Sequence, residues 1–316
     1  MSTAGSLPHR WAHPVTILVA TDLNDLDRLM PFAIRQAREN GARLILIHVL
    51  ASTAAFATDA AGLPYYDTAG LLEYADHVLM PWCQVARQHG TSCDALVREG
   101  TAAQQIAAAA RQFQADRVLL GTRSRSKLSK LLIGSVAEQV LRSVNLPVIT
   151  VGPEAHLPVE ESETRVVLHA TTLRETSRPS AALACQVAAT QGSSLVLLHV
   201  LPPIDDLCTQ GPASEIDAYT VEELRQLAAE TGAGCSIRVE PLVVHGNPSI
   251  EILAEAAELQ AQLIVLGSTH RSAFESLARD RTVCRVLAHA RCPVLTLHEP
   301  FGQQVEDHPE IIEVHL

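Results

Sequence analysis

The chain has 316 residues, a net charge of −11 at pH 7, 47% hydrophobic residues and only 3% aromatic residues. This length corresponds to about two domains, and the negative charge disfavours a nucleic-acid partner or an anionic membrane. The seven cysteines form no CxxC pair and no apolar run reaches membrane-span length, which together favour a cytoplasmic protein with reduced thiols.

Short runs of Val, Ile and Leu alternate with helical stretches along the whole chain. In the first half, strands are predicted at 15–21, 43–50, 93–98, 117–121 and 147–151, and helices at 26–40, 70–89, 102–113 and 135–143. In the second half, strands are predicted at 165–170, 194–201, 236–244, 262–267 and 293–298, and helices at 177–191, 214–231, 248–260 and 279–289. This alternation predicts βαβ units and parallel sheets that helices cover on both faces.

The second half repeats the first. Four segments match in order: 15–22 with 165–172, 44–50 with 195–201, 118–122 with 264–268, and 146–151 with 292–297. A repeat of this period indicates two copies of one domain. We predict a first domain at 1–151, a linker at 152–164, a second domain at 165–300 and an acidic tail at 301–316.

In the first copy, the carboxyl ends of the predicted strands carry residues suited to an anionic ligand. Ligands of open parallel sheets bind beyond these ends. Gly121 allows close approach of a ligand, the following loop is rich in Arg, Lys and Ser, and Gly134-Ser135 begins a helix whose N-terminus favours phosphate. Alternatively, Gly121 marks a turn, Ser135 is only an N-cap and the basic loop is solvated.

These residues resemble the universal stress protein family. Its ATP-binding members carry G-2x-G-9x-G-[ST] after the fourth strand and an Asp after the first strand. Here Gly121, Ser124 in place of the second Gly, and Gly134-Ser135 follow that spacing, and Asp22 stands at the Asp position. The resemblance covers almost the whole chain twice.

The resemblance implies two tandem Rossmann-like domains of the adenine nucleotide alpha hydrolase-like type, each with a five-stranded parallel sheet. It implies pairing of the strands at 147–151 and 293–298 within the chain, and leaves a homodimer open. It also implies that ATP with Mg binds the first domain. The residues that it places at the nucleotide are Asp22, Val49, Gly121, Thr122, Arg123, Ser124, Gly134, Ser135 and Val136.

The second copy departs from this pattern. Thr172 replaces the Asp, His270 stands at the second Gly position, and Asp280-Arg281 replaces Gly-Ser. Because an aspartate at a helix start repels phosphate, we expect no ATP there and no other cofactor. Four histidines, His169, His199, His245 and His270, offer a metal site as the weaker alternative. The stronger interpretation is structural, since His199 has a counterpart in His48.

Three functions remain open at this point. The first is a nucleotide-binding stress or signalling module without catalysis, because no residue is identifiable as a general base for hydrolysis. The second is an interaction or chaperone-like stress protein that binds no nucleotide. The third is a slow ATPase or autokinase in which Ser135 or a loop serine accepts phosphate.

Overall fold

The computed structural model describes residues 8–51, 68–122, 134–156, 165–203, 212–233, 235–268 and 281–298. The first half contains α1 (His9–Ala12), β1 (Thr16–Thr21), α2 (Leu26–Asn40), β2 (Arg43–Leu50), α3 (Thr68–Gln88), β3 (Cys93–Glu99), α4 (Ala102–Gln112), β4 (Arg117–Gly121), α5 (Ser135–Ser143) and β5 (Val148–Val151). The second half contains β6 (Val166–Ala170), η2 (Glu175–Ser177), α6 (Arg178–Thr190), β7 (Ser194–Leu201), α7 (Pro212–Ala233), β8 (Val239–His245), α8 (Pro248–Glu258), β9 (Leu263–Ser268), α10 (Arg281–His289) and β10 (Val294–His298).

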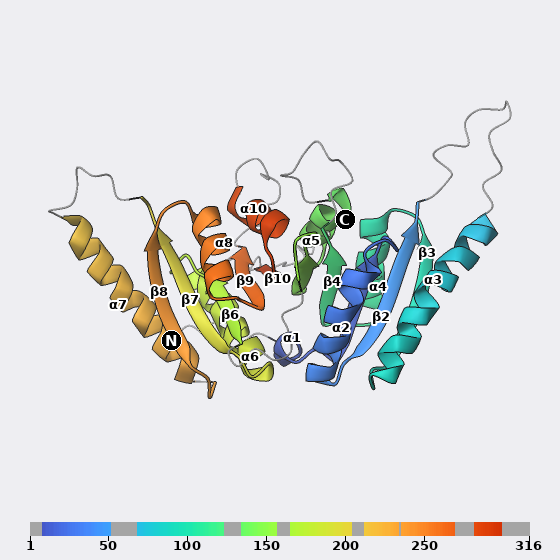
Figure 1. Cartoon of the computed structure of the whole chain (residues 1–316), viewed down its shortest axis with the longest axis horizontal. Helices are drawn as coiled ribbons and strands as arrows, with labels where there is room; N and C mark the ends of the chain where they lie inside the picture. Colours follow the sequence, from blue (N-terminus) through green and yellow to red (C-terminus); the bar gives the residue numbers. More distant parts are fainter. Residues whose placement is uncertain are drawn as a thin grey trace, which may run out of the picture.

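The ten strands form one sheet, in the order β3-β2-β1-β4-β5-β10-β9-β6-β7-β8 (Figure 1). Strands are parallel within each half, as predicted, and the halves meet where β5 and β10 pair antiparallel. In this junction Ile149 lies opposite Leu295. Thr150 Oγ1 donates to the Val294 carbonyl at 3.3 Å and Thr296 Oγ1 donates to the Val148 carbonyl at 3.2 Å, so the hydroxyls add two symmetric bonds to the ladder.

Helices cover both faces of the sheet. The strands β1, β4 and β5 are almost entirely buried, as expected for Val- and Leu-rich parallel strands between two helical layers. One core cluster packs α2, α3, α6 and α7 onto one face, and a second packs α4, α5, α8 and α10 onto the other. Both clusters extend across β5 and β10, so each layer of apolar packing is continuous through the junction.

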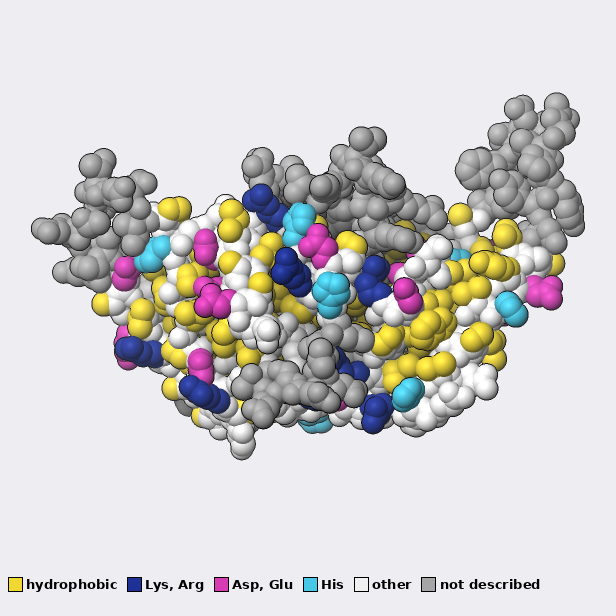
Figure 2. Space-filling model, in the orientation of Figure 1, with side chains coloured by type: hydrophobic (Ala, Val, Ile, Leu, Met, Phe, Trp, Pro, Cys, Tyr) yellow, Lys and Arg dark blue, Asp and Glu magenta, His cyan; other side chains and the backbone are white. Residues whose placement is uncertain are grey.

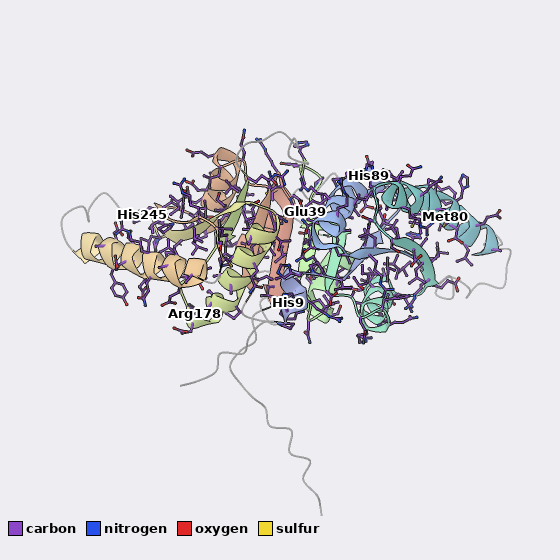
Figure 3. The ribbon with its side chains drawn as sticks, turned by 90° about the horizontal axis from the view of Figure 1, so that it is seen from below. His9, Glu39, Met80, His89, Arg178 and His245 are labelled. Carbon is purple, nitrogen blue, oxygen red and sulfur yellow. The ribbon has the colours of Figure 1, made fainter. Side chains whose placement is uncertain are left out.

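The short helix α1 adds a second contact between the halves. Its Trp11 carbonyl accepts a hydrogen bond from the fully buried Arg117, which also donates to Gln36. The following His13 lies 3.2 Å from the Thr190 hydroxyl of α6. Glu39 of α2 faces Arg165 at 3.9 Å, and both Glu39 and His9 lie close to the middle of the molecule in Figure 3.

Figure 2 shows Lys, Arg, Asp, Glu and His side chains near the middle of this face, with hydrophobic side chains between them and on either side. Within the described part of the chain, no helix is both long and apolar enough to cross a membrane.

Candidate functional site

The candidate site of the first half lies at the carboxyl ends of β1 and β4. These strands are neighbours, with β2 on the other side of β1, so the order of strands reverses between them. Such a reversal point is where open α/β sheets bind ligands. Asp22 directly follows β1, Gly121 is the last residue of β4, and Val49 lies near the end of β2.

Local hydrogen bonds fix the loop that carries Asp22. Its Oδ1 accepts the Asn24 N–H at 2.9 Å, and the Asn24 side chain donates to the Asp22 carbonyl at 3.1 Å. Leu23 has a φ of 71°, and its N–H donates to the Thr21 hydroxyl at 2.9 Å. These hydrogen bonds therefore hold the half-buried carboxylate of Asp22 in place at the carboxyl end of β1.

Among the described residues, no side chain caps the N-terminus of α5. Its N-cap is Gly134, which supplies no side-chain hydrogen bond, and Ser135 and Val136 are exposed. The first N–H groups of a helix have no acceptor within the helix, and together with the helix dipole they favour an anion. Thr122 plays a different part, because its buried hydroxyl donates to the Leu287 carbonyl of α10 at 3.4 Å. Arg123 and Ser124 lie outside the described residues.

Sequence reasoning missed two charged side chains of this site. The first turn of α2 places the Asp25 carboxylate and the Arg28 guanidinium against Gly121, so that a Cβ added at Gly121 would overlap with Asp25 and lie 3.4 Å from Arg28 Nη2. Nε and Nη2 of Arg28 are buried and have no hydrogen-bond partner among the residues that the structure describes. The available signal was the i, i+3 spacing of an acid and a base immediately after the loop of Asp22.

Burial raises the pKa of Asp25. Its side chain is 4% exposed, and loss of hydration outweighs the Thr21 hydroxyl, which donates to Asp25 Oδ1 at 2.6 Å, and the nearby charge of Arg28. Removal of water disfavours the charged form of a carboxyl group. The site therefore contains a carboxylate that is costly to ionise beside the first glycine of the motif.

We expect Asp25→Asn to raise the free energy of unfolding at pH 7 by about 1 kcal/mol. Because the pKa of Asp25 is raised in the folded state, its stabilising contribution is complete below the unfolded pKa of about 3.9 and is lost as pH rises through the folded value. Asn keeps an acceptor for Thr21 and carries no charge. Urea unfolding at pH 7 and pH 3.5 measures the effect; an equal change at both pH values would contradict it.

The second half repeats the geometry of the first strand and loop. Leu173 has a φ of 59°, and its N–H donates to the Thr171 hydroxyl at 3.2 Å, as Leu23 does to Thr21. His199 Nδ1 lies 2.8 Å from the Thr171 carbonyl, and His48 Nδ1 lies 2.9 Å from the Thr21 carbonyl. The two histidines thus make the same structural contact in both repeats.

The other histidines of the second half have separate environments. His169 is fully buried between the Val265 carbonyl and Ser180, and burial lowers its pKa to about 4. His245 contacts the Pro202 carbonyl and Asp217 of α7 (Figure 3). His270 lies outside the described residues. Among the residues with described positions, no three His, Cys, Asp or Glu side chains are placed to hold a metal ion.

The fold and the repeated motif define a protein made of two Rossmann-like α/β repeats that share one sheet. The model of the universal stress protein family matches residues 15–152 and 163–298, and the chain therefore belongs to that family. This confirms the predicted family and fold class.

Some relatives match both repeats and others match a length close to one repeat. A universal stress protein of Mycolicibacterium smegmatis is 28% identical over 296 residues, covering 89% of this chain and 96% of its own. One of Thermus aquaticus is 32% identical over 120 residues, 38% of this chain and 88% of its own. The crystal structure of a universal stress protein from Archaeoglobus fulgidus matches with a TM-score of 0.69 at 22% identity, covering 90% of this chain and 96% of that chain, which supports the fold.

Proposed function

We propose that the protein is a nucleotide-binding stress-response module in which the first repeat binds ATP with Mg. The observation that carries this proposal is the N-terminus of α5, which no described side chain caps and which follows the reversal point where Asp22 and Gly121 lie. Asp22 and Val49 would border the adenosine. The triphosphate would contact the segment from Gly121 to Ser124 and the backbone N–H groups of Ser135 and Val136.

The charges around Gly121 support a phosphate ligand. Nη2 of Arg28 lies against Gly121, and neither it nor Nε has a hydrogen-bond partner among the described residues. A buried polar group gains free energy when it finds a partner. A phosphate oxygen would supply that partner and neutralise the guanidinium. Arg28 of α2 and the N-terminus of α5 belong to opposite layers of the sheet, so they would reach a phosphate from two sides. The positive charge of Arg28 also offsets the negative charge of an ionised Asp25.

We propose that the second repeat does not bind ATP in this manner. Thr172 stands where the first repeat has Asp22, so the second repeat lacks the carboxylate that we place beside the adenosine. In the sequence, Asp280 stands where the first repeat has Gly134, which places negative charge at the helix start instead of an open cap. One nucleotide per chain is the resulting expectation.

Arg28→Gln is expected to weaken ATP binding about tenfold, which corresponds to the loss of one charge-assisted hydrogen bond of about 1.4 kcal/mol. The matched control is Arg38→Gln, which removes the same charge from the exposed last turn of α2. Calorimetric titration with Mg-ATP measures both variants. Equal Mg-ATP affinities for the two variants would show that Arg28 does not contact the nucleotide.

The same titration tests the proposal as a whole. Wild-type protein should bind Mg-ATP with a stoichiometry of one per chain. If folded protein released no heat and showed no thermal shift with Mg-ATP, an interaction or chaperone-like function without nucleotide would replace the proposal.

A further inference from the structure

Two cysteine side chains of the first repeat lie in contact in its core. Cys83 belongs to the C-terminal part of α3, and Cys93 is the first residue of the edge strand β3 (Figure 1). Their Sγ atoms are 2.9 Å apart, and both residues are 0% exposed. Because a disulfide has an S–S distance of about 2.05 Å, an approach of about 0.9 Å would bring the two sulfurs to bonding distance.

The turn between α3 and β3 holds this contact in place. Gly90 has a φ of 80°, which turns the backbone from the helix toward the strand. The Thr91 N–H donates to the Ala86 carbonyl at 3.0 Å, and the Arg87 guanidinium donates to the Cys93 carbonyl. Hydrogen bonds of the fold, rather than a bond between the sulfurs, therefore set the separation of the two thiols.

The two thiols differ in reactivity. The Cys93 S–H donates to Cys83 Sγ, and this hydrogen bond, together with the positive charge of Arg87, lowers the pKa of Cys83 although burial opposes the shift. The same hydrogen bond and burial raise the pKa of Cys93. Since the thiolate is the nucleophilic form of cysteine, Cys83 is the better nucleophile and Cys93 is the neutral thiol beside it.

The charged side chains that act on both thiols belong to the surface of the protein. Arg87 and Asp94 form an ion pair at 3.6 Å, and their side chains are 49% and 68% exposed. An exposed ion pair adds little to stability, and Asp94 directly follows Cys93 in the chain. Local opening of the turn between α3 and β3 would therefore admit a small oxidant without global unfolding.

We infer that Cys83 and Cys93 form a disulfide when the protein is exposed to hydrogen peroxide. The Cys83 thiolate attacks one peroxide oxygen and becomes a sulfenic acid, and the hydroxide that leaves takes up the proton that Cys83 had released. The Cys93 thiol then attacks the Cys83 sulfur, so that an S–S bond forms, the S–O bond breaks and a second water leaves with the Cys93 proton. The pair loses two electrons and two protons, and one peroxide becomes two waters.

The bond would cross-link α3 to the edge strand β3, which pairs only with β2 among the described strands. It would belong to the first repeat. Leu44 of β2 lies opposite Cys93, whereas Leu195, the counterpart of Leu44 in β7, lies opposite Val239. The inference does not depend on nucleotide binding, because neither cysteine belongs to the proposed nucleotide site.

Peptide mapping of the full chain tests the inference. Protein that has been reduced with dithiothreitol and desalted is treated with hydrogen peroxide, denatured, alkylated with iodoacetamide and digested with trypsin. Cleavage after Arg87 and Arg98 separates peptide 44–87, whose one cysteine is Cys83, from peptide 88–98, whose one cysteine is Cys93. The two peptides should be linked after peroxide treatment, alkylated and unlinked before it, and separated again by dithiothreitol.

Two variants test the order of the steps. In Cys93→Ser, peroxide should leave Cys83 as a sulfenic acid that dimedone labels, whereas in Cys83→Ser dimedone should not label Cys93. The matched control is Cys185→Ser, which removes a buried thiol of α6 in the second repeat and should keep the link between peptides 44–87 and 88–98. Oxidation should raise the melting temperature of this control by about 5 °C and leave that of Cys83→Ser unchanged.

The wild-type peptide map decides the outcome even if a variant fails to fold. Alkylated, unlinked peptides 44–87 and 88–98 after peroxide treatment would overturn the inference, and so would a link from Cys83 to any other cysteine. Dimedone labelling of Cys93 in Cys83→Ser, without labelling of Cys83 in Cys93→Ser, would contradict the assigned order of attack.

Discussion

Gly134→Asp is expected to weaken Mg-ATP binding at least about 100-fold. The new carboxylate would stand at the N-cap of α5, where we place the phosphates. Two unit charges about 4 Å apart repel by about 4 kcal/mol at an effective dielectric constant of about 20, and the triphosphate carries more than one charge. Equilibrium dialysis with labelled ATP measures the loss.

The same substitution should not destabilise the protein, and this separates binding from folding. Asp is a favourable N-cap and its charge favours a helix N-terminus, so the melting temperature should stay the same or rise. Thr101→Asp is the matched control, because it adds the same charge at the exposed N-cap of α4, which also lacks a side-chain cap. A similar loss of affinity in both variants would mean that net charge, rather than the start of α5, governs binding.

His169→Val is expected to remove a large part of the acid sensitivity of the fold. Burial lowers the pKa of His169 from 6.5 to about 4, and the ring lies 3.0 Å from the Val265 carbonyl and 3.4 Å from the Ser180 hydroxyl. A group whose pKa is depressed on folding contributes stability above its unfolded pKa. That contribution, about 3 kcal/mol, is lost as pH falls from about 6.5 to about 4.

Val is the matched replacement, because Val19 occupies the corresponding position of β1 and is equally buried. Urea unfolding at pH 7, 5.5 and 4 gives the free energy of unfolding for both proteins. Between pH 7 and pH 4, the free energy of unfolding of the wild type should fall by about 3 kcal/mol more than that of the variant. Parallel pH curves for the two proteins would show that His169 is not buried in its neutral form.

The sequence allowed most of the fold to be predicted because strong local patterns and tertiary packing agree. Fully apolar runs such as Leu44–Ile47 lie in the core as predicted, and the matching runs of the second half do the same. The start of β8 was predicted at 236, but the strand begins at Val239 because Ile237 N–H donates to the Cys235 carbonyl in a tight turn. Side-chain types alone do not distinguish that turn from an extended strand.

Helix α1 could not be predicted, since four residues carry no periodic pattern. Its bond to Arg117 joins residues 106 positions apart.

Contacts between distant residues also limited the prediction of the site. The spacing from Gly121 to Gly134-Ser135 is a local motif, whereas the contact of Asp25 and Arg28 with Gly121 depends on how α2 packs against β4.

The measurement that tests the central claim most directly is a crystal structure of the full chain grown with excess Mg-ATP. We predict density for one nucleotide, with the adenosine beside Asp22 and Val49 and the phosphates at the N-terminus of α5. A triphosphate at the second repeat, or an empty first repeat at saturating ATP, would contradict the account.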